Sequence, residues 1–89
     1  DSFFPDHADG YVARAGEKSS FVAIVQLMLR ELSADFDEIG ELEIDGIFGK
    51  ATEDAVSAFQ RASLLEVTGE VDLETYNRLS RAFIGISRN

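Results

Sequence analysis

The sequence predicts an all-α fold, a compact three-helix bundle with long loops. The first observation is that three segments, near residues 19–35, 50–62 and 73–83, carry apolar residues at spacings of three and four. The second is that glycine-containing stretches separate these segments. The third is the length of 89 residues, which is enough for one small domain and too short for two.

The first helix is expected over residues 19–35, after a stretch without regular periodicity. We interpret residues 1–15 as an irregular lead-in segment and residues 16–89 as the domain. Ser19 or Ser20 is suited to cap the helix, because a serine hydroxyl can accept a hydrogen bond from a first-turn amide. The buried stripe of this helix is expected to contain five residues: Val22, Val25, Leu29, Leu32 and Phe36.

The second and third helices are expected to begin after Gly49 and Asp72, which act as N-caps. Their buried faces converge with the first stripe in one predicted core: Val25, Leu29, Leu32, Val56, Phe59, Leu79 and Phe83. Between the helices, residues 42–44 and 65–71 read as short extended pieces that could pair with each other.

A weak internal repeat relates residues 46–57 to residues 69–80 at an offset of 23. Gly46 corresponds to Gly69 and Thr52 to Thr75, and each copy reads as a glycine turn followed by a helix start. We therefore expect the second and third helices to be entered through similar turns.

Composition and charge exclude several classes of protein. Eight Lys and Arg residues stand against 17 Asp and Glu, giving a net charge of −9. Nucleic acids and anionic membrane surfaces attract clustered positive charge, so we expect neither as a partner. The absence of cysteine excludes thiolate metal sites and cysteine nucleophiles. The chain begins with Asp1, so we expect it to be processed or to be a piece of a longer protein.

No catalytic, metal or cofactor motif is found. Asp35 and Asp37 resemble the start of a calcium-binding loop, but Gly46 stands where that loop needs a bidentate carboxylate. Gly46 and Gly49 are not followed by the Gly-Lys-Ser/Thr of a phosphate loop. His7, the single histidine, has no periodic partner that would favour a catalytic role.

One long motif, however, carries a resemblance. Residues 45–60 read Asp-Gly-Ile-Phe-Gly-Lys-Ala-Thr-Glu-Asp-Ala-Val-Ser-Ala-Phe-Gln. This resembles the signature of the peptidoglycan-binding-like domain family, Asp-Gly-x-Phe-Gly-x-x-Thr-x-x-Ala-Val-x-x-Phe-Gln, at every specified position. Weaker similarity extends over about residues 14–84, with Tyr76 at the position where the family usually has tryptophan.

The resemblance implies a three-helix bundle and a non-catalytic module that binds peptidoglycan or muropeptide. It also implies an extracytoplasmic location, at the cell wall or spore envelope of a bacterium, beside an attached or partner wall-lytic enzyme. We expect a monomer. The residues that match the family and could contact a ligand are Asp45, Gly46, Phe48, Gly49, Thr52, Gln60 and Tyr76.

Most of these residues also have a purely structural interpretation, and both interpretations stay open. Phe48 suits a core position and Asp45 could simply accept turn amides. Gln26 and Gln60 lie on the edges of buried stripes, where an amide needs partners, and the loop backbone is the natural one. An alternative function is a protein–protein interaction or inhibitory module that keeps the bundle without binding glycan.

Overall fold

The computed structural model describes residues 12–34, 36–40 and 42–87. These residues form the helices α1 (Ser20–Leu32), α2 (Lys50–Ala62) and α3 (Leu73–Ser87), with a short 3-10 turn, η1 (Asp37–Ile39). Over these ranges there is no strand, and the extended backbone makes isolated bridges instead. The prediction of an all-α domain with three helices is confirmed.

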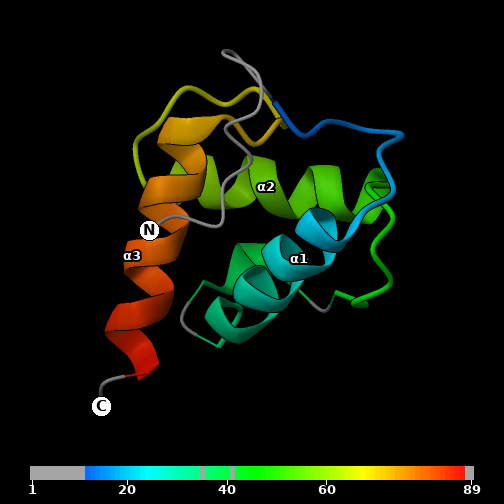
Figure 1. The fold of residues 1–89 in the computed structure, drawn as a ribbon. Coiled ribbons are helices and arrows are strands. Elements are labelled where there is room, and N and C mark those ends of the chain that lie inside the picture. Colours follow the sequence, from blue (N-terminus) through cyan, green and yellow to red (C-terminus); the bar gives the residue numbers. More distant parts are fainter. Residues whose placement is uncertain (1–11, 35, 41, 88–89) are drawn as a thin grey trace.

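Helix α1 holds the other elements together. It packs against both α3 and α2, and η1 packs against α2. Figure 1 shows α3 along one edge of the molecule, with α1 and α2 crossing beside it and long loops joining the helices. The described core combines the apolar faces of the three helices with residues of η1, the loops and the N-terminal segment. The helices contribute Phe21, Val22, Val25, Met28, Leu29, Leu32, Ala55, Val56, Ala58, Phe59, Tyr76 and Leu79, and the other segments contribute Ala13, Ile39, Leu42, Phe48 and Val71.

The predicted core residues come together as expected, except that Phe83 is half-buried at the edge of the cluster. Phe36, expected inside the first helix, follows it instead, and its ring lies 6.0 Å from that of Phe59, centroid to centroid. The predicted caps are also confirmed. Ser19 accepts a hydrogen bond from the amide of Val22, and Asp72 accepts one from the amide of Thr75.

Two helix boundaries differ from the prediction. Helix α1 ends at Leu32, because Ser33 forms its C-cap and donates its hydroxyl to the Arg30 carbonyl at 2.6 Å. Helix α3 runs to Ser87 rather than stopping at 83, because Gly85 continues the helical backbone. Helix α2 begins and ends where the sequence predicts.

The predicted pairing between residues 42–44 and 65–71 is wrong. The described residues of the N-terminal segment supply the partners instead, with bridges from Ala13 to Val71 and from Lys18 to Ile47. Ala13 and Val71 exchange two backbone hydrogen bonds of 2.9 and 2.8 Å, and both side chains are buried. Residues 12–18 therefore bind both glycine turns. The rest of the predicted lead-in, including His7, lies outside the described residues.

Candidate functional site

The signature motif is built around one buried amide. Gln26, in the middle of α1, is 1% exposed and faces the turn that begins at Asp45. Its carbonyl oxygen accepts the amides of Asp45 and Gly46 at 3.0 and 2.8 Å. Its nitrogen lies 3.0 Å from the Ile47 carbonyl and 2.9 Å from the Thr52 hydroxyl. We call this arrangement the Gln26 clamp, because one side chain fixes the turn to α1 and to the first turn of α2.

Asp45 completes the Gln26 clamp from the solvent side. Its Oδ1 accepts hydrogen bonds from the Ile47 amide and from Gln26, both at 3.0 Å. These bonds favour the ionised carboxylate, so the Ile47 amide and then Gln26 lower the pKa of Asp45 below its ordinary value. The other carboxylate oxygen, Oδ2, accepts no hydrogen bond from the described residues. A rigid, exposed carboxylate thus marks the turn.

A second clamp repeats this geometry around Gln60, which is also 1% exposed. Its oxygen accepts the amides of Thr68 and Gly69, and its nitrogen lies within hydrogen-bond distance of the Glu70 carbonyl and the Thr75 hydroxyl. Every loop partner lies 23 residues after its counterpart in the Gln26 clamp. The internal repeat of the sequence is therefore also a repeat of the structure. Thr68 corresponds to Asp45, and its neutral hydroxyl accepts hydrogen bonds from Gln60 and from the Glu70 amide.

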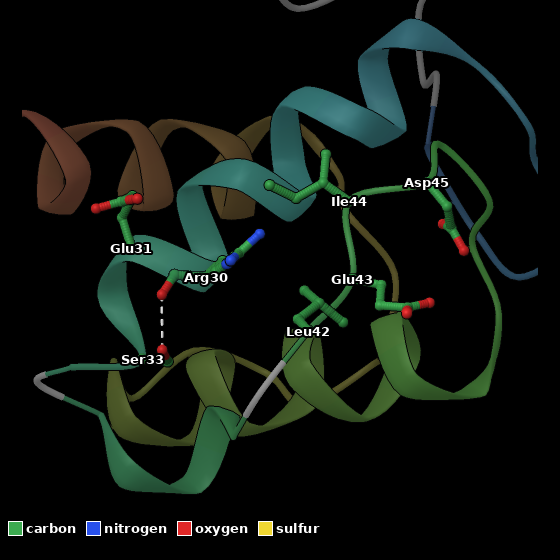
Figure 2. Close-up of a pocket in the computed structure, with 7 residues that line it drawn as sticks. All are labelled: Arg30, Glu31, Ser33, Leu42, Glu43, Ile44 and Asp45. Atoms are coloured by element: carbon green, nitrogen blue, oxygen red, sulfur yellow. Dashed lines mark hydrogen bonds between the residues drawn. The ribbon is translucent and has the colours of Figure 1, made fainter.

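A groove opens beside the Gln26 clamp, between the C-terminal part of α1 and the segment that leads to Asp45. Its volume is about 940 Å³, and seven residues line it: Arg30, Glu31, Ser33, Leu42, Glu43, Ile44 and Asp45. Figure 2 shows the two walls of this Asp45 groove, with Arg30 on α1 facing the extended segment that carries Leu42 and Ile44. Arg30 forms no ion pair with any described residue.

The Asp45 groove continues into a smaller recess at the start of α2. This recess of about 300 Å³ shares Leu42, Glu43 and Asp45 with the groove and reaches Gly49 and Lys50. Gly49 is the N-cap of α2 and has no side chain to block access to the first-turn amides. Groove and recess together offer apolar surface, backbone amides, a cation and carboxylates along one path.

The structure separates the predicted site residues into three groups. Asp45, Gly49 and Thr52 line the recess. Gly46 and Phe48 belong to the same turn but line neither hollow, and the Phe48 ring is buried in the core. The remaining two lie apart: Gln60 forms the second clamp, and Tyr76 packs against Phe21 with ring centroids 5.4 Å apart.

Of the residues that line the groove, only Asp45 was predicted from the sequence as a site residue. Nothing in the sequence indicated that Arg30 lines a groove, because an arginine in the last turn is common on any helix. Leu42 and Ile44 did give a signal, since they alternate with acidic residues on an extended piece. Alternation puts both side chains on the same face of the extended segment, and both line the groove. Leu42 reaches the core, at 7% exposed, whereas Ile44 is 39% exposed.

The described residues contain no cluster of three or more acidic or histidine side chains placed to hold a metal ion. Among the helices of the described ranges, none combines the length and apolar character needed to cross a membrane.

Two solved structures are similar to this chain. The SleB N-terminal domain matches with a TM-score of 0.70 and 25% identity, over 84% of this chain and 96% of that one. A peptidoglycan-binding protein from Clostridioides difficile, solved in complex with glutamine hydroxamate, matches with a TM-score of 0.73 and 30% identity, over 82% of this chain. The matched region is 42% of the C. difficile chain. No curated protein sequence matches significantly.

A family comparison matches residues 18–79, more than two thirds of the chain. The matched region begins just before α1 and ends within α3, and so includes both clamps and most of the core. The chain belongs to the family described as "Putative peptidoglycan binding domain".

Proposed function

We propose that this domain is a non-catalytic module that binds peptidoglycan or muropeptide in the Asp45 groove and the adjoining recess. The observation that carries the proposal is the continuous path from Arg30 past Asp45 to Gly49, on a turn that the Gln26 clamp holds rigid. Muropeptides combine sugars, peptide bonds and charged peptide ends, and this path offers partners for each. Family membership supports the same assignment.

Within this proposal the predicted residues have different roles. Asp45 and Gly49 contact the ligand, whereas Gly46, Phe48 and Thr52 shape the turn that presents them. For Gln60 and Tyr76, which lie away from the recess, contact with a ligand stays a prediction. Because the groove is open and shallow, we expect dissociation constants between micromolar and millimolar, about 4–8 kcal/mol of binding free energy.

We further propose that the module targets an attached or partner wall-lytic enzyme to the bacterial cell wall, and acts there outside the cytoplasm. Two facts about the similar structures support this. One match is the N-terminal domain of SleB, and the other occupies less than half of the chain in which it is found. In both, the similar unit is part of a larger protein.

The test is co-sedimentation of the domain with purified peptidoglycan, combined with NMR shift mapping using soluble muropeptides. We expect shifts at the amides of residues 42–50 and weaker retention of Arg30→Gln. Arg61→Gln is the matched control, because Arg61 is an exposed arginine in the last turn of α2 and lies outside both hollows. If neither sedimentation nor localised shifts occur, the interaction-module alternative replaces this proposal.

A further inference from the structure

Leu64 is held in a backbone conformation that does not suit it. Its φ angle is +62°, and it is the one non-glycine residue with positive φ among the described residues. It follows the C-cap of α2, where its own amide bonds to the Arg61 carbonyl and the next amide bonds to the Gln60 carbonyl. Helices usually place glycine at this position. The leucine side chain is 93% exposed, so packing within the domain gives no reason for it.

A groove on α3 lies next to this leucine. It measures about 490 Å³ and is lined by Leu73, Glu74, Asn77, Arg78 and Arg81, and we call it the α3 groove. The guanidinium of Arg78 donates to the carbonyl of Ser63 at 3.0 Å, which places this side chain beside Leu64. Leu73 is 51% exposed at the start of the groove. The two arginines of the groove therefore share it with an exposed leucine in the lining, Leu73, and one of them, Arg78, contacts the residue that Leu64 follows.

The α3 groove differs in charge from the other two hollows. Arginines outnumber carboxylates in its lining, two to one. The Asp45 groove has one arginine against three carboxylates, and the recess has one lysine against two. Neither Arg78 nor Arg81 forms an ion pair with a described residue. In a chain with a net charge of −9, the α3 groove is the one of these three hollows whose charge favours an acidic partner.

We propose that the α3 groove and Leu64 form a docking surface for an acidic peptide segment of a partner protein. Carboxylates of the segment pair with Arg78 and Arg81, and an aliphatic or aromatic side chain covers Leu64 and Leu73. The apolar pair favours a peptide over the phosphate-rich polymers of the cell wall, which have no side chain to cover it. This surface shares no residue with the Asp45 groove, so the inference goes beyond wall binding and does not depend on it.

The probe is a display library of random dodecapeptides, selected on the wild-type domain and counter-selected on Leu64→Gly combined with Arg78→Gln. We expect selected peptides to be rich in Asp and Glu with interspersed Leu, Ile or Phe. Binding should shift the amides of residues 64, 73, 77, 78 and 81, and each single variant should weaken it about tenfold or more.

Leu64→Gly is the decisive variant because it relieves backbone strain. It should unfold at a higher temperature than wild type and still lose the peptide, which separates docking from folding. Leu27→Ala, at an exposed leucine on α1, and Arg30→Gln are the matched controls and should bind the peptide normally.

Three results would overturn the proposal. One is selected peptides without acidic residues, and another is undiminished binding to Leu64→Gly. The third is soluble polyphosphate shifting the same amides with equal affinity, which would assign the surface to an anionic polymer. Sedimentation with peptidoglycan should be the same for Leu64→Gly and wild type, so a failure of wall binding is recognised separately.

Discussion

Gln26 and Gln60 show how a single side chain can fix a loop to a helix. Each carries one acceptor and one donor group. The oxygen satisfies two amides of a turn, and the nitrogen donates to a carbonyl of the same turn, which also accepts a second hydrogen bond. The sequence indicated both amides and their loop-backbone partners, because a polar residue at the edge of an apolar stripe needs such bonds. The repeat offset of 23 pairs Asp45 with Thr68, but it could not indicate that the Thr68 hydroxyl accepts the same two hydrogen bonds as the Asp45 carboxylate.

Replacing Gln26 by leucine should destabilise the domain by about 2–4 kcal/mol, because it removes the acceptor of the Asp45 and Gly46 amides. An unsatisfied buried amide costs about 1–3 kcal/mol. Gln60→Leu should cost a similar amount, since the second clamp has the same set of partners. Urea unfolding followed by circular dichroism measures both. Equal stability of either variant and wild type would contradict the role given to the clamps.

The ionised form of Asp45 should stabilise the fold at neutral pH. Its folded-state pKa lies below the ordinary value of 3.8, because the Ile47 amide and Gln26 bond to the carboxylate. The stabilisation is therefore complete above that value and is lost as the pH falls through the folded-state pKa. Asp45→Asn keeps an acceptor without the charge, so it should be less stable than wild type at pH 7.

This difference between Asp45→Asn and wild type should shrink as the pH falls below about 4, because the carboxyl group of Asp45 then becomes protonated in the unfolded chain first and in the folded domain at lower pH. Chemical denaturation of both proteins at several pH values between 7 and 3 measures it. The other acidic residues are common to both proteins and cancel in the comparison. A difference that stays constant over this range would show that the charge of Asp45 contributes nothing.

At the scale of elements, the turns at Gly46 and Gly69 have the same structure, and each leads into a helix. Gly46 and Gly69 have nearly the same positive φ, +75° and +76°, and each follows the residue that bonds to its clamp. A Cβ at Gly46 would lie 3.3 Å from the backbone oxygen of Ser19, the N-cap of α1. The three atoms nearest to a Cβ at Gly69 belong to the side chains of Glu53 and Ser57, which can rotate.

Gly46→Ala should therefore destabilise the domain more than Gly69→Ala. Both substitutions pay about 1–2 kcal/mol for the left-handed backbone, and Gly46→Ala also displaces the cap of α1. Thermal and urea unfolding provide the measurement. Gly85→Ala is a control of opposite sign, since Gly85 lies inside α3 with open space around it and alanine should stabilise the helix by about 0.5–1 kcal/mol. A larger loss for Gly69→Ala would refute the ranking.

Which elements could be predicted depends on the range of the interactions that form them. Helix α2 was predicted at both ends, because its apolar period and its glycine cap are local features. The bridges of Ala13 and Lys18 to the two turns were missed, because backbone pairing between distant segments leaves no trace in periodicity. The pairing of the two groove walls could not be predicted for the same reason. Arg30 and Ile44 line one groove only because the loop folds back along α1.

At the scale of the whole molecule, the negative net charge opposes the proposed binding to the cell wall. The chain carries a net charge of −9, and bacterial walls carry anionic polymers, so the two repel each other at long range. Proposed binding in the Asp45 groove must then come from hydrogen bonds and close packing. The local charge does not reverse this, because carboxylates outnumber Arg30 in the lining of that groove.

Salt should therefore not release the domain from the wall. Its screening length is about 10 Å at 0.1 M and shorter at higher concentrations, so salt weakens the long-range repulsion and leaves short hydrogen bonds nearly unchanged. On walls that keep their anionic polymers, we expect retention to rise with salt, and on polymer-stripped peptidoglycan we expect it to stay level. Co-sedimentation of both preparations across a salt series measures this. A steep loss of retention with salt on stripped peptidoglycan would mean that ion pairs hold the domain, and would contradict this mechanism even with binding established.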